Sequence, residues 1–470
     1  MFEKKTYIAR RAALVRKMEG RGLVVLPGHV ESPVNYLGNT YHFRQDSTFL
    51  YYFGLSVPGL AAVIDTDSGE ATLFGDDFTV DDIIWMGPQP GITDLAASVG
   101  VSRTALFASF TAEVRAAVAK GREVHFLPPY RGETRLLLSG ALPAGAAPSA
   151  DLIRAVVSMR DKKSAEEIEQ IEEACAIGYE MHTLAMSMCH PGVTEREIAG
   201  AIEGVSLKHG WGVSFHPIVS QHGETLHNHN HSGVLETGRL LLVDAGAEAT
   251  SGYASDFTRT IPVGGTFTSR QRDIYEIVLA ANNLAFDIAT PSMRYVDVHL
   301  AACRMLIEGL SSLGLIRGSI DDAVATGAHS LFMPHGLGHQ MGLDVHDMED
   351  MGEQYVGYDA ETPRSTHPSC SACRMGRRLE AGMVVSVEPG IYFVPALIAK
   401  WHGGGGPANA AAFIDFGRVE SYLDFGGIRL EDDMLITSDG NRLLGTAPDG
   451  SPRRIPITPN EVAVAVRDMK

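Results

Sequence analysis

The stretch LLLVDAGAEATSGYASDFTRT, residues 240–260, contains two aspartates in neighbouring runs of apolar and β-branched residues. Such runs indicate β-strands, and the glycine-containing segment between them indicates a turn. Two strands joined in this way can direct the carboxylates of Asp244 and Asp256 into one pocket. The stretch therefore predicts a sheet that carries an acidic site.

Three further strings each supply one more candidate metal ligand. MPHGLGHQMGLDVHD contains His339, while VVSVEPGIYF and FGGIRLEDD place Glu388 and Glu431 beside apolar, β-branched runs. Four carboxylates balance two divalent cations, and an oxygen-rich set with one imidazole favours Mn²⁺, with Co²⁺ or Zn²⁺ as alternatives. Two ions roughly 3.5–4 Å apart would lower the pKa of water bound between them. The five residues, Asp244 and Asp256 included, predict a two-metal hydrolase.

In order and local sequence, these strings resemble the metallopeptidase family of methionine aminopeptidases, aminopeptidase P and prolidase. The resemblance runs through residues 160–440. It implies a pita-bread catalytic domain, in which helices flank a pseudo-symmetric, curved antiparallel sheet. One departure is visible, because Asp244 and Asp256 lie one residue further apart than in the commonest family pattern. We expect a lengthened turn at residues 249–252.

Length and composition predict two domains of mixed α/β (α+β) class. A chain of 470 residues exceeds the roughly 250–300 residues beyond which single cores tend to divide. The segment SGALPAGAAPSA ends at residue 150 and is rich in Ala, Pro and Gly, so we expect domains at 1–150 and 151–470. Residues 41–59 resemble the amino-terminal domain of aminopeptidase P and prolidase, which methionine aminopeptidases lack. The first domain is therefore expected to be small, α/β and of the aminopeptidase P kind.

Three capping-box patterns mark helix starts in the second domain. Each sets a Ser or Thr three residues before a Glu or Gln, ahead of apolar residues at helical spacing. The pairs are Ser164 with Glu167, Thr194 with Glu197, and Thr268 with Gln271. Gly210 is expected to end the second helix. Helices thus precede strands in each half of the domain.

The resemblance also implies roles around the metals. Glu388 is expected to carry the proton from water toward the leaving nitrogen as well as to bind metal. His227, 17 residues before Asp244, and His346, 7 after His339, match histidines that contact substrate or the tetrahedral intermediate. His229 and His231 are expected to be structural or incidental.

Proline at the second position of a peptide calls for a dedicated pocket. Its tertiary amide has no N–H and its ring fixes φ, so a site that grips an extended backbone is poorly suited to it. By resemblance, Phe215, His335 and Arg429 are expected near the proline ring. Arg429, two residues before Glu431, would also lie on the same strand face as that ligand and orient its carboxylate.

Two substrate classes stay open. Arg374, 14 residues before Glu388, matches the prolidase arginine that pairs with a dipeptide's carboxylate, and the separation of 43 residues between Glu388 and Glu431 also resembles prolidase. The amino-terminal segment with Trp85, and Arg160 with it, resemble aminopeptidase P, in which they are expected to contact substrate. We favour an Xaa-Pro aminopeptidase, with an Xaa-Pro dipeptidase as the alternative.

Charge and composition limit which partners and which cellular compartment are expected. A net charge of −18 disfavours nucleic acid and anionic membranes as partners. No apolar run approaches the roughly 18–20 residues of a membrane span, and the basic first residues lack a secretory apolar region. A cytoplasmic protein is expected, and the resemblance implies a homodimer or larger homo-oligomer.

A binding module and a metal-free amidine hydrolase are the alternatives to a metallopeptidase. Relatives of this fold that serve as binding modules have lost the metal ligands, and creatinase cleaves a small amidine without metals. The complete ligand set argues against both.

The five cysteines are an odd number without export signals, which fits a reducing compartment. Cys370 and Cys373 form a CxxC pair, but no second CxxC accompanies it and nothing nearby resembles a thioredoxin unit. We expect an incidental pair in a polar loop.

Overall fold

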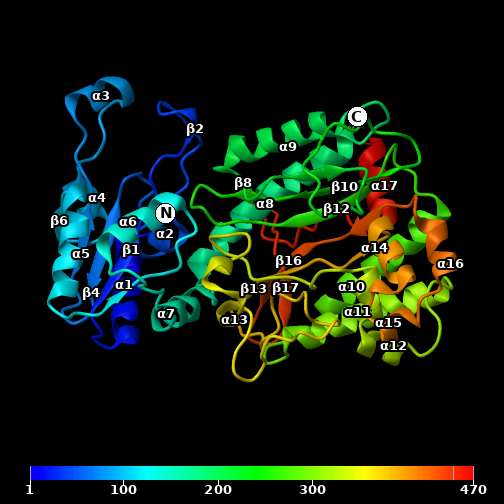
Figure 1. Ribbon diagram of the computed structural model, residues 1–470. Coiled ribbons are helices and arrows are strands. Elements are labelled where there is room, and N and C mark those ends of the chain that lie inside the picture. Colours follow the sequence, from blue (N-terminus) through cyan, green and yellow to red (C-terminus); the bar gives the residue numbers. More distant parts are fainter. Residues whose placement is uncertain (1, 448, 469–470) are drawn as a thin grey trace. The chain divides into compact units, whose positions relative to one another are not determined.

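The computed structural model describes residues 2–447 and 449–468, which form two compact units (Figure 1). The first unit extends to Arg160 and takes in Met348–Tyr355; the second comprises Asp161–Asp347 and the chain from Val356 onward. The division therefore falls after the expected residue 150. Helix α7 (Ala150–Arg160) belongs to the first unit because it buries its apolar side chains there and packs against α1 (Lys4–Met18).

A mixed five-stranded sheet forms the centre of the first unit, in the order β6-β5-β4-β1-β7. β4 pairs antiparallel with β1 and β5, whereas the outer pairs β1 with β7 and β5 with β6 are parallel. The sheet strands are β1 (Leu23–Pro27), β4 (Ala61–Asp65), β5 (Ala71–Phe74), β6 (Arg103–Ala105) and β7 (Val124–His125). The other elements, besides α1 and α7, are β2 (Pro33–Tyr36), β3 (Asn39–Thr40), α2 (Ser47–Phe53), α3 (Val80–Met86), α4 (Ile92–Ser98), η1 (Phe107–Ser109), α5 (Phe110–Ala119), α6 (Gly132–Ala141) and η3 (Glu349–Met351).

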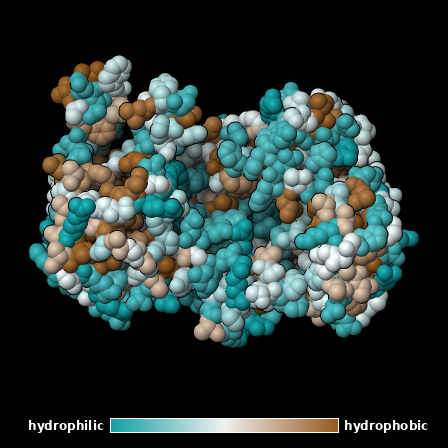
Figure 2. Space-filling view, in the orientation of Figure 1, coloured by the Kyte–Doolittle hydropathy of each residue, from teal (hydrophilic) through white to brown (hydrophobic). Residues whose placement is uncertain are grey.

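Helix α3 is exposed along its whole length although most of its residues are apolar. It has no buried residue, and Figure 2 shows brown, hydrophobic atoms over this helix. Trp85 is 86% exposed and Ile84 70% exposed. The helix thus presents an apolar surface that its own unit does not cover.

The second unit is built from two halves with the same order of elements, two long helices followed by antiparallel strands (Figure 1). The first half contains α8 (Ala165–Met188), α9 (Glu195–His209), β8 (Gly212–Val213), β9 (Ile218–Ser220), β10 (Leu240–Ala245), β11 (Ala247–Glu248) and β12 (Phe257–Pro262). The second half contains α10 (Ser269–Ile288), α11 (Tyr295–Ser312), α12 (Ile320–Thr326), η2 (Ala328–Leu331), β13 (Val384–Val387), β14 (Gly390–Tyr392), β15 (Gly427–Arg429), β16 (Asp432–Ile436) and β17 (Asn441–Leu443). Helix α13 (Glu353–Val356) lies in the chain where the two units divide, and α17 (Pro459–Asp468) follows the last strand. Short helices lie between β14 and β15: α14 (Pro395–Lys400), η4 (Trp401–Gly405), α15 (Ala408–Ala411), α16 (Phe416–Val419) and η5 (Glu420–Tyr422).

Each half contributes one curved part of the sheet. The strand orders are β12-β10-β9 and β13-β16-β17, with β14 and β15 as a separate pair. An antiparallel bridge between Thr258 and Glu431 joins the two parts. Helix α8 packs on the strands of the first half and α10 on β14, β15 and β17 of the second. This arrangement confirms the expected pseudo-symmetric sheet between helices.

The three predicted helix starts are confirmed. In α8, α9 and α10 the Ser or Thr side chain accepts a hydrogen bond from the third helical N–H, and the Glu or Gln side chain accepts one from the cap residue's own N–H. Gly210 follows the last turn of α9, as expected. The helices therefore begin where local side-chain bonds satisfy N–H groups that lack helical partners.

No helix in the described parts of the chain is both long and apolar enough to span a membrane.

Candidate metal centre

The two aspartates of the opening stretch lie on one face of a hairpin. β10 and β12 pair antiparallel with Asp244 opposite Thr258, so Asp256 is the diagonal neighbour of Asp244 on the same side. The longer turn between them is closed by a hydrogen bond from the Gly252 N–H to the Ala249 carbonyl at 2.8 Å. Gly252 takes a φ of 86°, which few other residues adopt. The additional residue is therefore absorbed in the turn, and both carboxylates stay directed to one site.

His339 comes from an extended loop held against β13. Its N–H donates to the Ser386 hydroxyl at 3.1 Å, and its Nδ1 bonds the Gln340 carbonyl at 3.0 Å. Gly338 permits this approach, because a Cβ there would lie 2.0 Å from the Ser386 carbonyl oxygen. The second ring nitrogen, Nε2, lies 3.5 Å from an Asp256 oxygen. With Nδ1 held by a carbonyl, Nε2 faces the carboxylates in the orientation that metal-binding histidines take.

The two glutamates complete the set from the second half. Glu388 follows β13 directly, and its Oε1 lies 3.7 Å from His339 Nε2. Glu431 lies between β15 and β16, and its Oε2 accepts a hydrogen bond from the Thr258 hydroxyl at 2.6 Å. Ligating atoms of Asp256, His339 and Glu431 all lie within 4.8 Å of one another. All five predicted ligands therefore meet where the two halves of the sheet join.

A cavity of about 410 Å³ opens over these ligands. It is lined by the five ligands and by most of the other predicted residues. These are Phe215, His227, His335, His346, Arg374 and Arg429.

Burial and mutual repulsion disfavour charge on the carboxylates. Burial, followed by the charge of Asp244, raises the pKa of Asp256 well above its usual range. Burial and then Asp256 do the same for Glu431, and burial raises the pKa of Glu388. Burial also lowers the pKa of His339, which keeps that imidazole neutral and available as a ligand. So many buried acidic groups are stable as anions only with cations between them.

The donor set fits divalent cations. Among the described side chains, Asp244 Oδ1 and Asp256 Oδ1 are buried without a hydrogen-bond partner, and both belong to this site. Orphaned carboxylate oxygens cost free energy unless a cation coordinates them. Oxygen donors with one imidazole suit Mn²⁺, Co²⁺ or Zn²⁺.

Arg429 takes a different partner from the one expected. Its guanidinium forms an ion pair with Asp244, not with Glu431, and also donates to the Thr258 hydroxyl at 3.1 Å. Arg429 is the last residue of β15 and points across the seam toward β10 and β12, whereas Glu431 lies beyond the strand end. The alternation of side chains along a strand predicted that Arg429 and Glu431 share a face, but the strand ends at Arg429 and the rule does not extend to Glu431.

Tyr392 is a residue of the site that the sequence analysis missed. Its hydroxyl receives a hydrogen bond from Arg429 at 2.8 Å and lies 2.9 Å from His335 Nε2. The residue is fully buried at the end of β14, four positions after Glu388. Its position four residues after Glu388 was the only sign in the sequence that Tyr392 could belong to the site.

The remaining predicted residues fall in different places. His346 stacks on His339 with ring centres 3.9 Å apart, and burial lowers its pKa to about 2. His229 lines the cavity, whereas His231 bonds the Pro217 carbonyl at 3.0 Å. His229 is therefore placed to meet a ligand, and His231 has the structural role expected of it.

Arg160 and Trp85 belong to the first unit and do not line this cavity. Arg160 is buried at the end of α7, where it donates to the Thr48 hydroxyl at 2.9 Å. Their expected contacts with substrate stay predictions.

Comparisons with known proteins agree with this geometry. The model of metallopeptidase family M24 matches residues 169–438. The chain belongs to metallopeptidase family M24. The amino-terminal domain of aminopeptidase P matches residues 7–125, which confirms the expected kind of first domain.

Relatives of this M24 protein match it along nearly its whole length. A probable Xaa-Pro aminopeptidase of Aspergillus clavatus is 32% identical over 94% of this chain and 90% of its own. The Xaa-Pro aminopeptidase of Escherichia coli K12 is 31% identical over 95% of each chain. The structure of zinc-substituted E. coli aminopeptidase P in complex with product matches with a TM-score of 0.79, at 29% identity over 100% of this chain and 99% of that chain. The M24 protein is thus a metal-dependent exopeptidase with the pita-bread fold.

Proposed function

We propose that the chain is an Xaa-Pro aminopeptidase, which hydrolyses the bond between a first residue and a following proline. The observation that carries the proposal is one cavity that combines a complete set of metal ligands with Phe215, His335 and Arg429. The relatives named Xaa-Pro aminopeptidase, and the amino-terminal domain shared with aminopeptidase P, support it.

Asp244, Asp256, His339, Glu388 and Glu431 are the residues proposed to hold two divalent ions. Mn²⁺ fits this oxygen-rich set, with Co²⁺ and Zn²⁺ as alternatives. When bound, the ions supply Lewis acidity, which polarises the scissile carbonyl and lowers the pKa of water.

Glu388 is proposed to move the proton. Its side chain is 19% exposed, compared with 7% for Asp256 and 11% for Asp244, so it faces the cavity more than they do. A carboxylate that faces the cavity can accept a proton from water and return it to the leaving group. Glu388 would take a proton from the attacking water and give it to the leaving nitrogen.

His227 and His346 are proposed as donors to the oxygen that gains charge during attack. Burial, followed by Arg429, lowers the pKa of His227, and burial with His339 lowers that of His346. Both rings are therefore neutral near pH 7, and each retains one N–H to donate.

Phe215, His335 and Arg429 are proposed to shape the proline pocket. Burial lowers the pKa of His335 to about 3, so its ring presents a neutral, flat surface. The Tyr392 hydroxyl holds His335 and Arg429 in place. A pocket of this kind accepts a pyrrolidine ring without needing an N–H from the substrate.

A matched pair of peptides tests the proposal. Release of free alanine would be followed from Ala-Pro-Ala and from Ala-Pro, after metal removal and reloading with Mn²⁺, with Ala-Ala-Ala as control. We expect the tripeptide with proline to be cleaved best. Cleavage of Ala-Ala-Ala at the same rate would refute specificity for proline, and cleavage of Ala-Pro alone would establish a dipeptidase.

The dipeptidase alternative has one observation in its favour, the presence of Arg374 in the cavity. If Arg374 binds the substrate's terminal carboxylate, Arg374→Ala should lower kcat/KM for Ala-Pro by about 1.5–3 kcal/mol of transition-state free energy, roughly tenfold or more. It would change Ala-Pro-Ala cleavage much less. Arg378→Ala is the control, since Arg378 lies in the same connection but pairs with Glu361 at the surface. Equal losses on both peptides would remove this role from Arg374.

A homo-oligomer is proposed as well, supported by the exposed apolar surface of α3 with Trp85. Surfaces of this kind are typical of protein interfaces. Sedimentation of the wild type and of Trp85→Ser with Ile84→Ser tests it. A monomeric wild type would contradict the proposal.

A further inference from the structure

A second group of metal-ligating side chains lies buried in the catalytic unit, separate from the five ligands described above. His299 and Cys303 are one turn apart on α11, and His329 lies in η2. Cys370 and Cys373 come from the long connection between α13 and β13. Both cysteines lie in a loop, as expected, but their side chains are buried, since Cys373 is 1% exposed and Cys370 9%.

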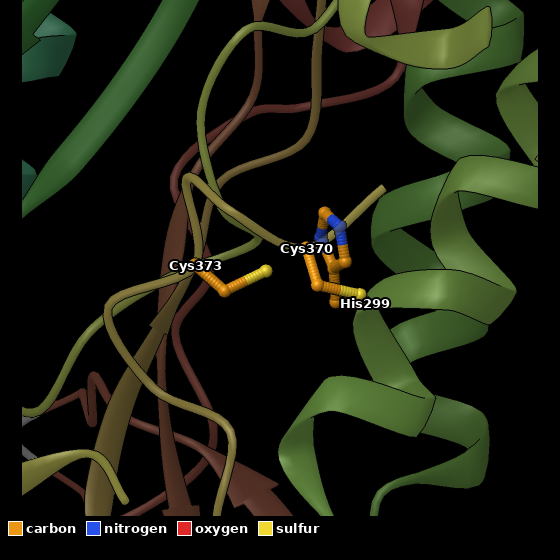
Figure 3. A group of neighbouring side chains, drawn as sticks. All are labelled: His299, Cys370 and Cys373. Atoms are coloured by element: carbon orange, nitrogen blue, oxygen red, sulfur yellow. The ribbon is translucent and has the colours of Figure 1, made fainter. Parts of the chain in front are cut away.

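The side chains of this group point toward one another. Figure 3 shows the Cys373 sulfur directed toward Cys370 and His299. The ligating atoms of His299, Cys370 and Cys373 all lie within 4.8 Å of one another. In a tetrahedral zinc site with Zn–S bonds of 2.3 Å, sulfur ligands lie roughly 3.8 Å apart, so small movements of the side chains would close this set around an ion.

Two further donors stand beside this set. Cys303 Sγ lies 3.5 Å from the His299 ring, and the ligating atoms of His299, Cys303 and His329 also lie within 4.8 Å of one another. The two sets share His299, so a fourth ligand for the first set would have to come from the second by a movement of the Cys303 or His329 side chain.

The backbone carbonyl of Ser369 fixes the two imidazoles. It lies 3.0 Å from His299 Nε2 and 3.2 Å from His329 Nε2, so each ring can donate its Nε2–H to the same oxygen. In that tautomer Nδ1 carries the lone pair, as in a metal-binding histidine oriented by a carbonyl. His329 Nδ1 is buried and has no hydrogen-bond partner. A buried ring nitrogen without a partner is costly, and a bound cation would satisfy it.

We propose that His299, Cys370 and Cys373 bind a zinc ion, with Cys303 or His329 as the fourth ligand. Thiolates with imidazole select zinc over the harder cations that suit the carboxylate centre. A site closed by four protein ligands has no open position for substrate and is structural. A cavity of about 290 Å³, lined in part by His299, His329 and Cys373, gives an ion a way in.

A zinc ion at this site would fix the segment between α13 and β13, which contains Arg374. Arg374 follows Cys373 directly and lines the catalytic cavity. On the other side, Gly336 packs so closely that a Cβ there would lie 2.9 Å from Cys373 Cα, and His335 precedes it. Zinc at Cys373 would thus fix the position of two residues that face the substrate, from outside the reaction site.

Cobalt spectroscopy on the full chain tests the proposal without any variant. The five ligands of the catalytic centre contain no sulfur, so a thiolate-to-cobalt charge-transfer band after exchange with Co²⁺ reports the second site alone. This readout is independent of peptidase activity, so the proposed function and the zinc site can fail separately. We expect the band in the wild type, and its absence would overturn the proposal.

Variants and metal analysis localise the site. Cys370→Ser with Cys373→Ser should abolish the band and lower the zinc content by about one equivalent per chain. Cys189→Ser, a buried cysteine of the first half, is the matched control and should keep both. A band that persists in the double variant would overturn the assignment. So would a Cys370–Cys373 disulfide in unreduced wild-type protein, detected by mass spectrometry, since it would remove two of the three proposed main ligands.

Discussion

At the scale of single residues, the metal centre depends on carboxylates that are costly to bury without a cation. Asp256 shows this most clearly. Its pKa is raised by burial and by neighbouring carboxylates, and its Oδ1 has no protein partner. The Asp256 side chain stays in the site because other groups hold the backbone of Asp256. The Asp433 carboxylate, for example, accepts a hydrogen bond from the Asp256 N–H at 3.1 Å.

Asp256→Ala and Glu431→Ala should each abolish activity and lower the content of bound Mn²⁺, because each removes a central ligand. In the metal-free state the same variants should be at least as stable as the wild type, since an uncompensated buried carboxyl is gone. Metal analysis and thermal unfolding with and without chelator measure both effects. Asp424→Ala, an exposed carboxylate, serves as control. Full metal content and activity in either variant would refute the ligand assignment.

His182 is a buried residue whose protonation, unlike that of Asp256, opposes folding. It is buried on α8, its Nε2 donates to the Ala245 carbonyl at 3.0 Å, and burial lowers its pKa to about 4 from 6.5. The folded state binds the proton more weakly than the unfolded chain, so this stability is present above about pH 6.5 and is lost as the pH falls toward 4. The difference corresponds to about 3 kcal/mol at most.

His182→Gln should therefore flatten the loss of stability between pH 6.5 and pH 4, because the amide can still donate to Ala245 but does not titrate. Urea unfolding at both pH values measures this. An unchanged pH dependence in the variant would show that other groups are responsible.

At the scale of elements, a buried arginine fastens the strands that carry the ligands. Arg259 of β12 is fully buried, and each of its five N–H groups has an acceptor. These are the carbonyls of Thr258, Glu431, Ile455 and Pro456 and the carboxylate of Asp432. The arginine thus fixes the backbone on both sides of the seam.

Arg259→Lys should destabilise the protein by about 3 kcal/mol or more, because a lysine cannot reach all five acceptors and leaves buried polar groups unpaired. Arg270→Lys, the same change in an exposed pair with Asp424, should cost about 1 kcal/mol or less. Chemical unfolding compares the two. Similar losses in both variants would contradict the role given to Arg259.

Elements whose signals are local could be predicted from the sequence. The capping boxes at Ser164, Thr194 and Thr268 each involve residues three positions apart, and the acidic hairpin needed only its own strands. Arg259, Tyr392 and the partner of Arg429 escaped prediction because each contact crosses the seam or joins distant strands. The burial of Cys370 and Cys373 escaped it for the same reason, since a polar stretch gave no sign of the helix packed against it.

At the scale of the whole molecule, the metal ions should stabilise one unit only. All five proposed ligands belong to the second unit. A ligand present at 100 times its Kd adds about 2.7 kcal/mol to the state that binds it. Calorimetry should therefore show that a chelator lowers the Tm of the second unit and leaves that of the first unchanged. Asp256→Ala should show a much smaller shift, and an equal shift in both units would refute this division.

The contact between Thr258 and Glu431 spans 173 residues of chain. Contacts of such long range form late, because the intervening chain must be ordered first. Glu431 is the last of the five proposed ligands in the order of the chain, so a nascent chain that has not yet reached it has no complete set. The metal centre is therefore expected to assemble only after the ribosome has passed Glu431, whereas the strands that carry Asp244 and Asp256 are made long before.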